Sequence, residues 1–360
     1  MGNVILVGWI NKGKAADCGE TMKNQLLVRR LNELGVGCRQ LDFKGWRKRP
    51  WVFLQLGWNL LAHREDTLIF STSTENVYGL MKWMKRIRWK QNTVHWVIGG
   101  SLGRKVQRGI YDADVIGYMN HTLVESPLMA EQLEAAGVKG VKETPNFKPI
   151  PYYPKAKVRY PDAGGPLKFV FLSRIMPEKG CDDILEAARL LNEEGLESQY
   201  QVDFWGKIAD GYQEGFLKKV ADLENVQFRG FLHLDDSAGY DQLSSYDMML
   251  FPTYWKGEGF AGVFIDAFIS GLPILATDWA HNRRFLTEEE TALFVPVHDV
   301  IALKDKMEAC IHGQYDLTEM SRNCRMQAER YNVTNVVTES LLQEIGVISC
   351  RQNQHEVISR

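Results

Sequence analysis

Short hydrophobic runs alternate, along most of the chain, with stretches in which hydrophobic residues recur every three or four positions. A short run bounded by glycine or proline predicts a buried strand, and the wider spacing predicts a helix that packs by one face. Leu26, Leu27 and Leu31 form such a face in the helix expected at 20–34, with Arg30 at its margin. Strands are expected in this way at 4–9, 93–100, 115–119, 141–144, 168–173, 201–205, 226–229, 248–251 and 274–276. The alternation predicts an α/β protein with parallel sheets.

A proline-rich stretch divides this pattern. Residues 148–166 contain five prolines and little hydrophobic periodicity, as expected of a connection between domains. With 360 residues, 45% of them hydrophobic, the chain is long enough for two α/β domains with cores of their own. We expect a first domain at 1–150, a second at 151–335, and a C-terminal helix and tail at 336–360.

Charge is unevenly distributed between the two halves. Residues 1–150 hold 22 Lys and Arg against 13 Asp and Glu, whereas the remainder holds 21 against 32, for a net charge of −2. The six cysteines show no paired spacing, which favours a reducing, cytoplasmic setting. The N-terminus has no signal-peptide pattern, and the longest hydrophobic run, near 51–62, is too short to span a bilayer. A soluble protein, or at most a peripheral one at the inner face of the cell membrane, is expected.

Two segments of the basic half interleave tryptophan with lysine and arginine. They are Trp46, Arg47, Lys48 and Arg49 in the segment 44–58, and Lys82, Trp83, Lys85, Arg86, Arg88 and Trp89 in the segment 82–90. An anionic membrane surface suits this mixture, because aromatic rings sit at headgroup level and cations near phosphates. Nucleic acid would also suit it, but no nucleic-acid motif accompanies it, and none is expected as a partner. The alternative is a solvated helix face with its tryptophans packed inward.

Candidate chemistry concentrates between residues 250 and 278. A strand end is followed by the loop 253–260 around Glu258, then by a helix that Gly271 ends, and then by a further strand. A loop that leads into a helix N-terminus presents unpaired backbone N–H groups and the positive end of the helix dipole, which suit an anion. Glu258 and Asp266 bracket this helix start, and carboxylates there are more suited to accept hydrogen bonds from sugar or ribose hydroxyls.

Two cations follow the strand expected at 168–173. Arg174 and Lys179 lie five residues apart, flanking a helix start at the carboxyl end of a strand, where together they can neutralise a diphosphate. In the first domain, Gly13, Lys14 and Gly19 occupy a strand–helix loop, but their spacing is neither a dinucleotide-binding fingerprint nor a P-loop. That loop is equally consistent with an ordinary connection.

Two other sets of polar residues are interpreted as structural. His95 lies at the beginning of its strand, whereas catalytic groups in open α/β sheets gather at the carboxyl ends, so we expect a core histidine. Asp112 and Asp114 form a D-x-D sequence that could suggest a metal site. They lie between an expected helix at 105–111 and the expected strand at 115–119, where acidic residues commonly mark a turn.

The motifs together resemble those of retaining GT-B glycosyltransferases of family 4. Glu258 and Asp266 resemble the E-x7-E element, with aspartate in the second position, and SRIMPEKG, which holds Arg174 and Lys179, is similar to the G-R-x4-K-G element. The resemblance implies a GT-B fold, with two Rossmann-like domains facing across a cleft and the final helix packed back on the first domain. It implies catalytic roles for Glu258, Arg174 and Lys179, and donor binding by Asp266, Gly259, Phe260, Ala261, Gly262, Gly19, Gly206, Phe231 and Arg283.

The resemblance also implies an activity: metal-independent transfer of a hexose from a nucleoside-diphosphate sugar, with UDP expected rather than GDP and no cofactor. The acceptor is expected to be a saccharide, lipid-linked in the assembly of a cell-surface polysaccharide. The chain departs from the family at Asp266, which is one methylene shorter than glutamate, and at residues 277–285, where His281 and Arg283 stand in place of a glycine-rich segment. A histidine expected in the first domain has no counterpart. Two alternatives therefore stay open, a non-catalytic nucleotide-sugar-binding partner of a transferase and a sugar-nucleotide epimerase.

Overall fold

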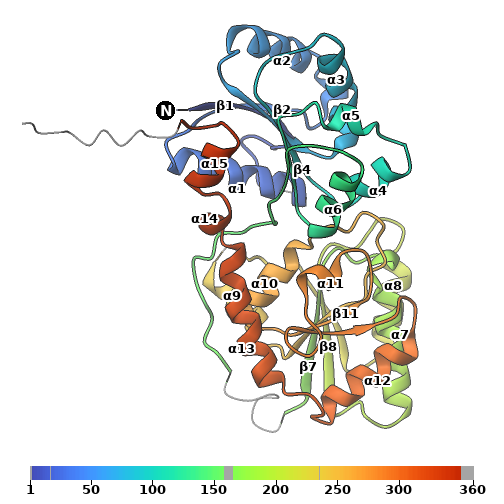
Figure 1. Ribbon diagram of the computed structural model, residues 1–360. Helices are drawn as coiled ribbons and strands as arrows, with labels where there is room; N and C mark the ends of the chain where they lie inside the picture. Colours follow the sequence, from blue (N-terminus) through green and yellow to red (C-terminus); the bar gives the residue numbers. More distant parts are fainter. Residues whose placement is uncertain (1, 17, 158–164, 235, 350–360) are drawn as a thin grey trace, which may run out of the picture. The chain divides into compact units, whose positions relative to one another are not determined.

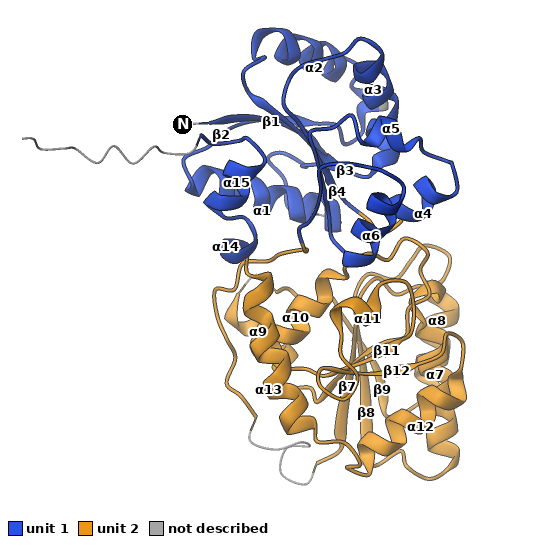
Figure 2. Ribbon diagram, in the orientation of Figure 1, with its two compact units in different colours: residues 1–98, 102–144, 333–360 blue, residues 99–101, 145–332 orange. Residues whose placement is uncertain are grey.

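The computed structural model (Figure 1) describes residues 2–16, 18–157, 165–234 and 236–349. The chain forms two compact units (Figure 2). Unit 1 comprises residues 1–98, 102–144 and 333–360, and unit 2 comprises 99–101 and 145–332. The last described residues are tied into unit 1: Asn92 donates to the carbonyl oxygen of Ile345 (2.8 Å), and Thr67 to that of Gly346 (2.9 Å).

Unit 1 is a parallel α/β domain. Its described residues include a six-stranded sheet in the order β2-β1-β3-β4-β5-β6, with parallel pairing throughout. The strands are β1 (Asn3–Gly8), β2 (Gly37–Asp42), β3 (Thr67–Thr72), β4 (Thr93–Val97), β5 (His121–Val124) and β6 (Val141–Glu143). The helices are α1 (Gly19–Glu33), α2 (Trp51–Ala62), α3 (Thr74–Arg86), α4 (Leu102–Gln107), α5 (Ala113–Ile116), α6 (Pro127–Ala135), α14 (Val333–Val336) and α15 (Glu339–Glu344).

Unit 2 repeats this architecture, with a second six-stranded parallel sheet, in the order β12-β11-β10-β7-β8-β9, among its described residues. The strands are β7 (Leu167–Leu172), β8 (Tyr200–Trp205), β9 (Val226–Gly230), β10 (Met248–Phe251), β11 (Ile274–Thr277) and β12 (Ala292–Val295). The helices are α7 (Cys181–Glu193), α8 (Gln213–Ala221), α9 (Ser237–Ser244), α10 (Gly262–Ser270), α11 (Asn282–Phe285), α12 (Val300–Ile311) and α13 (Leu317–Ala328). The prediction of two Rossmann-like α/β domains is confirmed.

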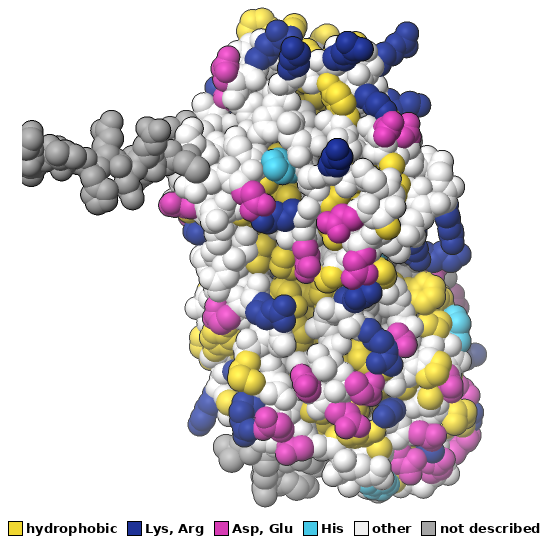
Figure 3. Space-filling model, viewed as in Figure 1, with side chains coloured by type: hydrophobic (Ala, Val, Ile, Leu, Met, Phe, Trp, Pro, Cys, Tyr) yellow, Lys and Arg dark blue, Asp and Glu magenta, His cyan; other side chains and the backbone are white. Residues whose placement is uncertain are grey.

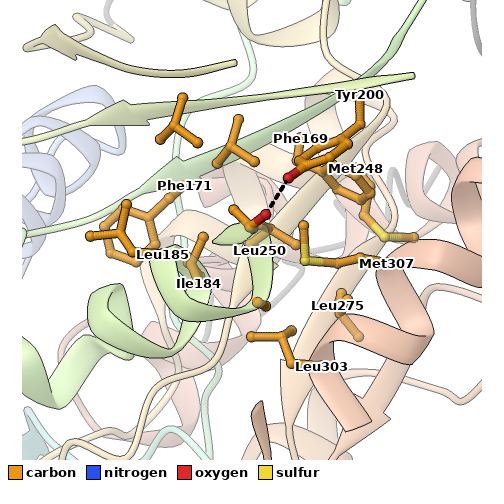
Figure 4. Close-up of a cluster of buried hydrophobic side chains, with 14 of the residues drawn as sticks. Phe169, Phe171, Ile184, Leu185, Tyr200, Met248, Leu250, Leu275, Leu303 and Met307 are labelled. Carbon is orange, nitrogen blue, oxygen red and sulfur yellow. Dashed lines mark hydrogen bonds between the residues drawn. The ribbon is translucent and has the colours of Figure 1, made fainter. Parts of the chain in front are cut away.

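One hydrophobic core of unit 2 lies between its sheet and helices α7 and α12 (Figure 4), and a second includes residues of α9 and α10. Phe169 and Phe171 of β7 pack with Ile184 of α7 and Met307 of α12, all fully buried. The hydroxyl of Tyr200 enters this core and donates to a carbonyl oxygen of α7 at 2.8 Å, so its burial leaves no orphaned donor. This core holds the strand ends rigidly, and the loops that follow them inherit that rigidity.

One expected strand is wrong. Residues 115–119 do not form a strand: the chain makes the short helix α5 there, and the sheet is entered only at β5. Asp112 explains the difference, because its side chain accepts a hydrogen bond from the backbone of Asp114 at 2.9 Å and caps that helix. The aspartate pair therefore has the structural role that the sequence indicated. Where a C-terminal helix was expected, the described residues form the two short helices α14 and α15.

No helix in the described part of the chain is long and apolar enough to cross a membrane.

Candidate active site

The strand order of unit 2 defines where a ligand site is expected. Strands β10 and β7 are neighbours in the sheet. The chain continues from β7 to β8 on one side and from β10 to β11 on the other, so the loops after β7 and β10 lead away in opposite directions. In open parallel sheets this divergence leaves a crevice beyond the carboxyl ends of the two strands, and ligands bind there. Arg174 and Lys179 follow β7, and Glu258 follows β10. The topology therefore brings together the residues that the sequence singled out.

A buried ion pair joins the two loops. The ammonium of Lys179 donates to Oε2 of Glu258 at 2.5 Å, and the two residues are only 6% and 8% exposed. Thr253 donates to the same carboxylate oxygen at 3.1 Å. Because a buried charge is costly unless it is paired and hydrogen-bonded, each partner offsets the cost of burying the other. No sequence pattern singled out Thr253 as a third member of this group.

Backbone contacts keep the two loops in register. The amide of Tyr254 donates to the carbonyl oxygen of Glu178 at 2.9 Å. Gly180 lies directly against Pro252: it has a φ of +76°, and a Cβ there would come within 2.2 Å of the Pro252 carbonyl oxygen. Only glycine fits both the conformation and the close approach. This contact explains why Lys179 can reach Glu258.

Arg174 is held in a different way. Its side chain is exposed, and its guanidinium lies 5.6 Å from the ring centroid of Trp255, within the range of a cation–π contact. Trp255 is itself fixed, since its carbonyl oxygen accepts from the indole of Trp279 at 2.9 Å. Among the residues that the structure describes, Arg174 makes no ion pair. The Arg174 guanidinium is therefore held beside Trp255, without a carboxylate partner among the described residues.

Helix α10 begins immediately after this loop. Ala261 occupies its N-cap position without a side-chain hydrogen bond, so the first-turn N–H groups receive no side-chain cap. Gly259 and Phe260 are buried beside it, and the Phe260 ring packs 4.2 Å from that of Phe285. Phe260 can therefore offer a ligand only its backbone. Gly262, the first helical residue, leaves space near the side chains of Asn146 and Lys148.

Asp266 lies one turn further along α10 and is already occupied. Its Oδ2 is paired with the ammonium of Lys148, and its Oδ1 accepts from the hydroxyl of Tyr240 at 3.0 Å. Asp266 is only 3% exposed. Burial, reinforced by the neighbouring Asp266 carboxylate, raises the pKa of Tyr240, so this hydroxyl remains a donor. Lys148 lies in the segment interpreted as a connection, and no sequence pattern links it with Asp266.

The other predicted donor-binding residues of unit 2 have varied surroundings. Gly206 packs against the end of β7, where a Cβ would come within 1.7 Å of the Ser173 carbonyl oxygen, so the fold itself requires glycine. The Phe231 side chain is 63% exposed and contacts the His233 ring. Arg283 pairs with Asp278 at 2.7 Å and lies 3.5 Å from a Glu288 oxygen. Its charge is therefore already neutralised.

Three further residues from the sequence analysis are located as follows. Gly19 is the first residue of α1 in unit 1, and nothing lies within 4 Å of the position that a Cβ would take there. His281 is buried, with Nε2 3.0 Å from the carbonyl oxygen of Gly100, which groups with unit 2. His95 is fully buried in β4 of unit 1, and burial lowers its pKa to about 4.

The arrangement in unit 2 suits an anion more than a metal ion. One exposed guanidinium, one lysine and the start of a nine-residue helix lie at one edge of the sheet, with a single carboxylate among them. Groups of three or more His, Cys, Asp or Glu side chains that could hold a metal ion are absent from the described residues. The chemistry available is charge neutralisation of a phosphate by fixed donors.

Comparison with known proteins gives a family match for this region. Residues 154–331 match the model described as glycosyl transferases group 1. Over 293 residues the chain is 24% identical to a phosphatidyl-myo-inositol mannosyltransferase of Mycobacterium leprae, a match that covers 81% of this chain and 69% of that protein.

Two solved structures share the fold of the chain. Sucrose-phosphate synthase from Thermosynechococcus elongatus has a TM-score of 0.73 at 16% identity, covering 93% of this chain and 96% of that one. The Anabaena HepE protein, solved in complex with UDP, has a TM-score of 0.66 at 14% identity, covering 95% and 99%. Two six-stranded parallel sheets and these likenesses identify the fold as GT-B, which confirms the fold that the sequence resemblance implied.

Proposed function

We propose that the chain, which matches the glycosyl transferases group 1 family model over residues 154–331, transfers a sugar from a nucleoside diphosphate to a saccharide acceptor. The observation that carries this proposal is the group formed by Arg174, Lys179 and Glu258 at the split between β7 and β10. The named relative, a mannosyltransferase, supports the reaction class. The HepE structure, solved with UDP, supports UDP as the carrier.

In the proposed reaction the bond between the anomeric carbon and the diphosphate breaks as the acceptor oxygen bonds to that carbon. Arg174, Lys179 and the N–H groups at the start of α10 stabilise the charge that develops on the departing diphosphate. A diphosphate oxygen receives the acceptor's proton, and the anomeric configuration is retained. Glu258 holds the sugar and stabilises its oxocarbenium-like carbon. Cations fixed in this way make a metal ion unnecessary.

The test begins with donor binding. Thermal melting with a panel of nucleoside diphosphates and their sugars should show a rise for the true donor, because a ligand of the folded state stabilises it. Arg174→Ala and Lys179→Ala should then each weaken diphosphate binding by about 1.5–3 kcal/mol, the contribution of a charge-assisted hydrogen bond. Unchanged affinity in both variants would remove the phosphate assignment.

The acceptor side of the proposal rests on unit 1. Helix α2 is hydrophobic on two faces. One face is buried in the unit and consists of Val52, Leu56 and Leu60. The other face is between 53% and 77% exposed and consists of Trp51, Leu54, Trp58 and Leu61. This spacing puts the exposed four on one stripe of the helix. Figure 3 shows hydrophobic and basic side chains side by side over α2 and α3.

Such a stripe is the form that an interfacial helix takes at a lipid surface. We infer that unit 1 docks on an anionic membrane by this stripe, with the basic residues of the segments 44–58 and 82–90 beside it. Docking would present the enzyme to a lipid-linked saccharide acceptor of cell-surface polysaccharide assembly at the cytoplasmic face. The basic residues contribute roughly 1 kcal/mol each near an anionic surface.

Co-sedimentation with anionic vesicles at low and high salt tests the docking. Leu54→Ser with Trp58→Ser should abolish it, while Ile301→Ser with Met326→Ser, which alters two equally exposed hydrophobic residues of unit 2, should not. Salt should weaken binding, because the Debye length is about 10 Å at 0.1 M. Binding that both double variants retain, or that salt leaves unchanged, would favour a soluble acceptor.

A further inference from the structure

A cavity in unit 1 is lined by several positively charged side chains that take no part in the proposed transferase site. It has a volume of about 380 Å³ and lies where the chain leaving α2 meets the turn after α3. Three of its six lining residues are the cations Arg64, Arg88 and Lys90, and no carboxylate lines it; the others are Ile87, Trp89 and Gln91.

The floor of this cavity is rigid. Gln91 is buried and donates to the carbonyl oxygens of His63 and Asp66 at 3.1 and 2.8 Å, which ties the turn to the end of α2. The indole of Trp89 donates to the Gln91 side chain at 3.1 Å, and the Trp89 carbonyl oxygen accepts from the hydroxyl of Tyr118 at 2.8 Å. The turn is therefore organised before any ligand arrives, which reduces the entropy cost of binding.

One of the cations is held over this floor. The Arg64 guanidinium lies over the Trp89 ring, 4.7 Å from its centroid. Arg88 has a φ of +55°, a strained left-handed conformation that few non-glycine residues adopt. Such backbone strain persists where the surroundings enforce it and is concentrated at ligand sites. Here hydrogen bonds on both sides of the residue, from the amides of Arg88 and Trp89 to α3, enforce it.

None of the three cations makes an ion pair with another described residue. Three like charges around one cavity repel one another, and an anion bound between them would relieve this repulsion. Two guanidiniums and an ammonium match the several oxygens of a phosphate group. The rim has an apolar side: Ile87 lines it and is 45% exposed, and Trp83, which is 46% exposed, lies beside Trp89 with ring centroids 6.2 Å apart.

We propose that this cavity, defined by Arg64, Arg88, Trp89 and Lys90, is a binding site for a phosphate ester, with the apolar rim receiving the hydrophobic part of an amphiphile such as an anionic phospholipid. The site is separate from the donor site in unit 2. It also differs from docking by the α2 stripe, because it binds a single headgroup and does not require a bilayer. Its failure would therefore leave both earlier proposals standing.

The test uses the full chain and soluble probes, so that vesicle docking does not enter. Titration calorimetry with dihexanoyl phosphatidic acid, below its micelle concentration, is compared with inorganic phosphate and with dihexanoyl phosphatidylcholine. We expect phosphatidic acid to bind at one site, and the zwitterionic lipid to bind at least tenfold more weakly. Inorganic phosphate binding as tightly as phosphatidic acid would identify a free phosphate as the ligand; weaker binding would identify the lipid headgroup.

Matched triple variants assign the site. Arg64→Gln, Arg88→Gln and Lys90→Gln together should weaken phosphatidic acid at least tenfold. Arg29→Gln, Arg108→Gln and Lys139→Gln remove the same charge from exposed positions of unit 1 outside the cavity and should change affinity less than twofold. Trp89→Phe, which keeps a ring beneath Arg64, should retain most of the binding, and melting curves verify folding of each variant.

Three results would overturn the proposal. One is the absence of binding by any of the phosphate probes. Another is an equal loss of affinity in both triple variants, which would mean diffuse attraction without a site. The third is an oligonucleotide that competes with phosphatidic acid at the same concentration, because this would make the cavity a nucleic-acid contact.

Discussion

Replacing Glu258 with glutamine should tighten the binding of a nucleoside diphosphate while it slows sugar transfer. The Glu258 carboxylate accepts a 2.5 Å hydrogen bond from Lys179. A diphosphate that uses Lys179 must therefore compete with this carboxylate. Glutamine keeps the shape and the hydrogen-bonding oxygen but removes the charge, and it leaves Lys179 more available to the phosphate.

The size of the effect follows from the two kinds of hydrogen bond. Both hydrogen bonds involve the charged ammonium and contribute about 1.5–3 kcal/mol, with the bond to a carboxylate near the upper end and the bond to a neutral amide near the lower end. The difference of about 1–1.5 kcal/mol corresponds to roughly a fivefold to tenfold lower dissociation constant for the diphosphate. Turnover should fall, because the carboxylate is lost from the reacting sugar, and the loss should lie mainly in kcat.

Stability provides a second measurement of the same contact. Lys179 is only 6% exposed, and removing one partner of a buried pair costs about 3–5 kcal/mol. Glu258→Gln should therefore lower the melting temperature of the free protein. Saturating diphosphate should raise it by more than in the wild type, because the phosphate restores a counter-charge to Lys179.

Titration calorimetry with UDP and GDP measures the affinity, and Glu178→Gln serves as the control. Glu178 is adjacent to Lys179 in the chain, but its side chain makes no ion pair in the part of the chain that the structure describes. It should change affinity less than twofold. A Glu258→Gln variant whose diphosphate affinity is unchanged or weaker than that of the wild type would refute the competition, and wild-type turnover in that variant would refute the catalytic role of Glu258.

Two further predictions concern the buried polar groups. Asp266→Asn should lose about 3–5 kcal/mol of stability, because it leaves Lys148 without its carboxylate. Its turnover per folded molecule should nevertheless fall less than that of Glu258→Gln. Equal losses of turnover in the two variants would give Asp266 a direct part in the chemistry. His95, whose pKa burial lowers from 6.5 to about 4 in the folded state, should make stability fall as pH drops from about 6.5 to 4, since the unfolded chain binds the proton more readily. Urea denaturation measures this effect as the free energy of unfolding of the wild type minus that of His95→Gln. This difference should be about 2 kcal/mol lower at pH 5 than at pH 7. The same pH dependence in both proteins would contradict the prediction.

The residues of the proposed donor site could be found in the sequence because, in a parallel sheet, loops that follow different strands lie at the same edge. Arg174 and Lys179 follow one strand and Glu258 another, and the carboxyl ends of these strands meet at one edge of the sheet. The ion pair between Lys179 and Glu258 was not foreseen, although both members were singled out. A pattern of strand ends indicates which residues share an edge but not which of their atoms touch.

Other features depended on contacts that local patterns do not contain. Lys148 and Asp266 are 118 positions apart, and Lys148 lies in a segment whose prolines indicated only a connection. The strand expected at 115–119 is wrong because Asp112 accepts a hydrogen bond from the Asp114 amide and caps a helical turn there. The run at 51–62 was recognised as too short to span a bilayer, but its hydrophobic residues occupy two faces of the helix. Which stripe of α2 is exposed could be decided only by packing.

The ion pairs near α10 indicate which cation of the proposed donor site a diphosphate contacts first. Asp266 is paired with Lys148, and Glu258 with Lys179, whereas Arg174 is the exposed member of the group and has no carboxylate partner among the described residues. Arg174 is thus the cation that an incoming diphosphate can engage without breaking a contact. Lys179 becomes available only as the phosphate replaces Glu258 beside it. We infer that binding the diphosphate releases the Glu258 carboxylate, so the group that stabilises the reacting sugar is freed at the moment when the sugar arrives.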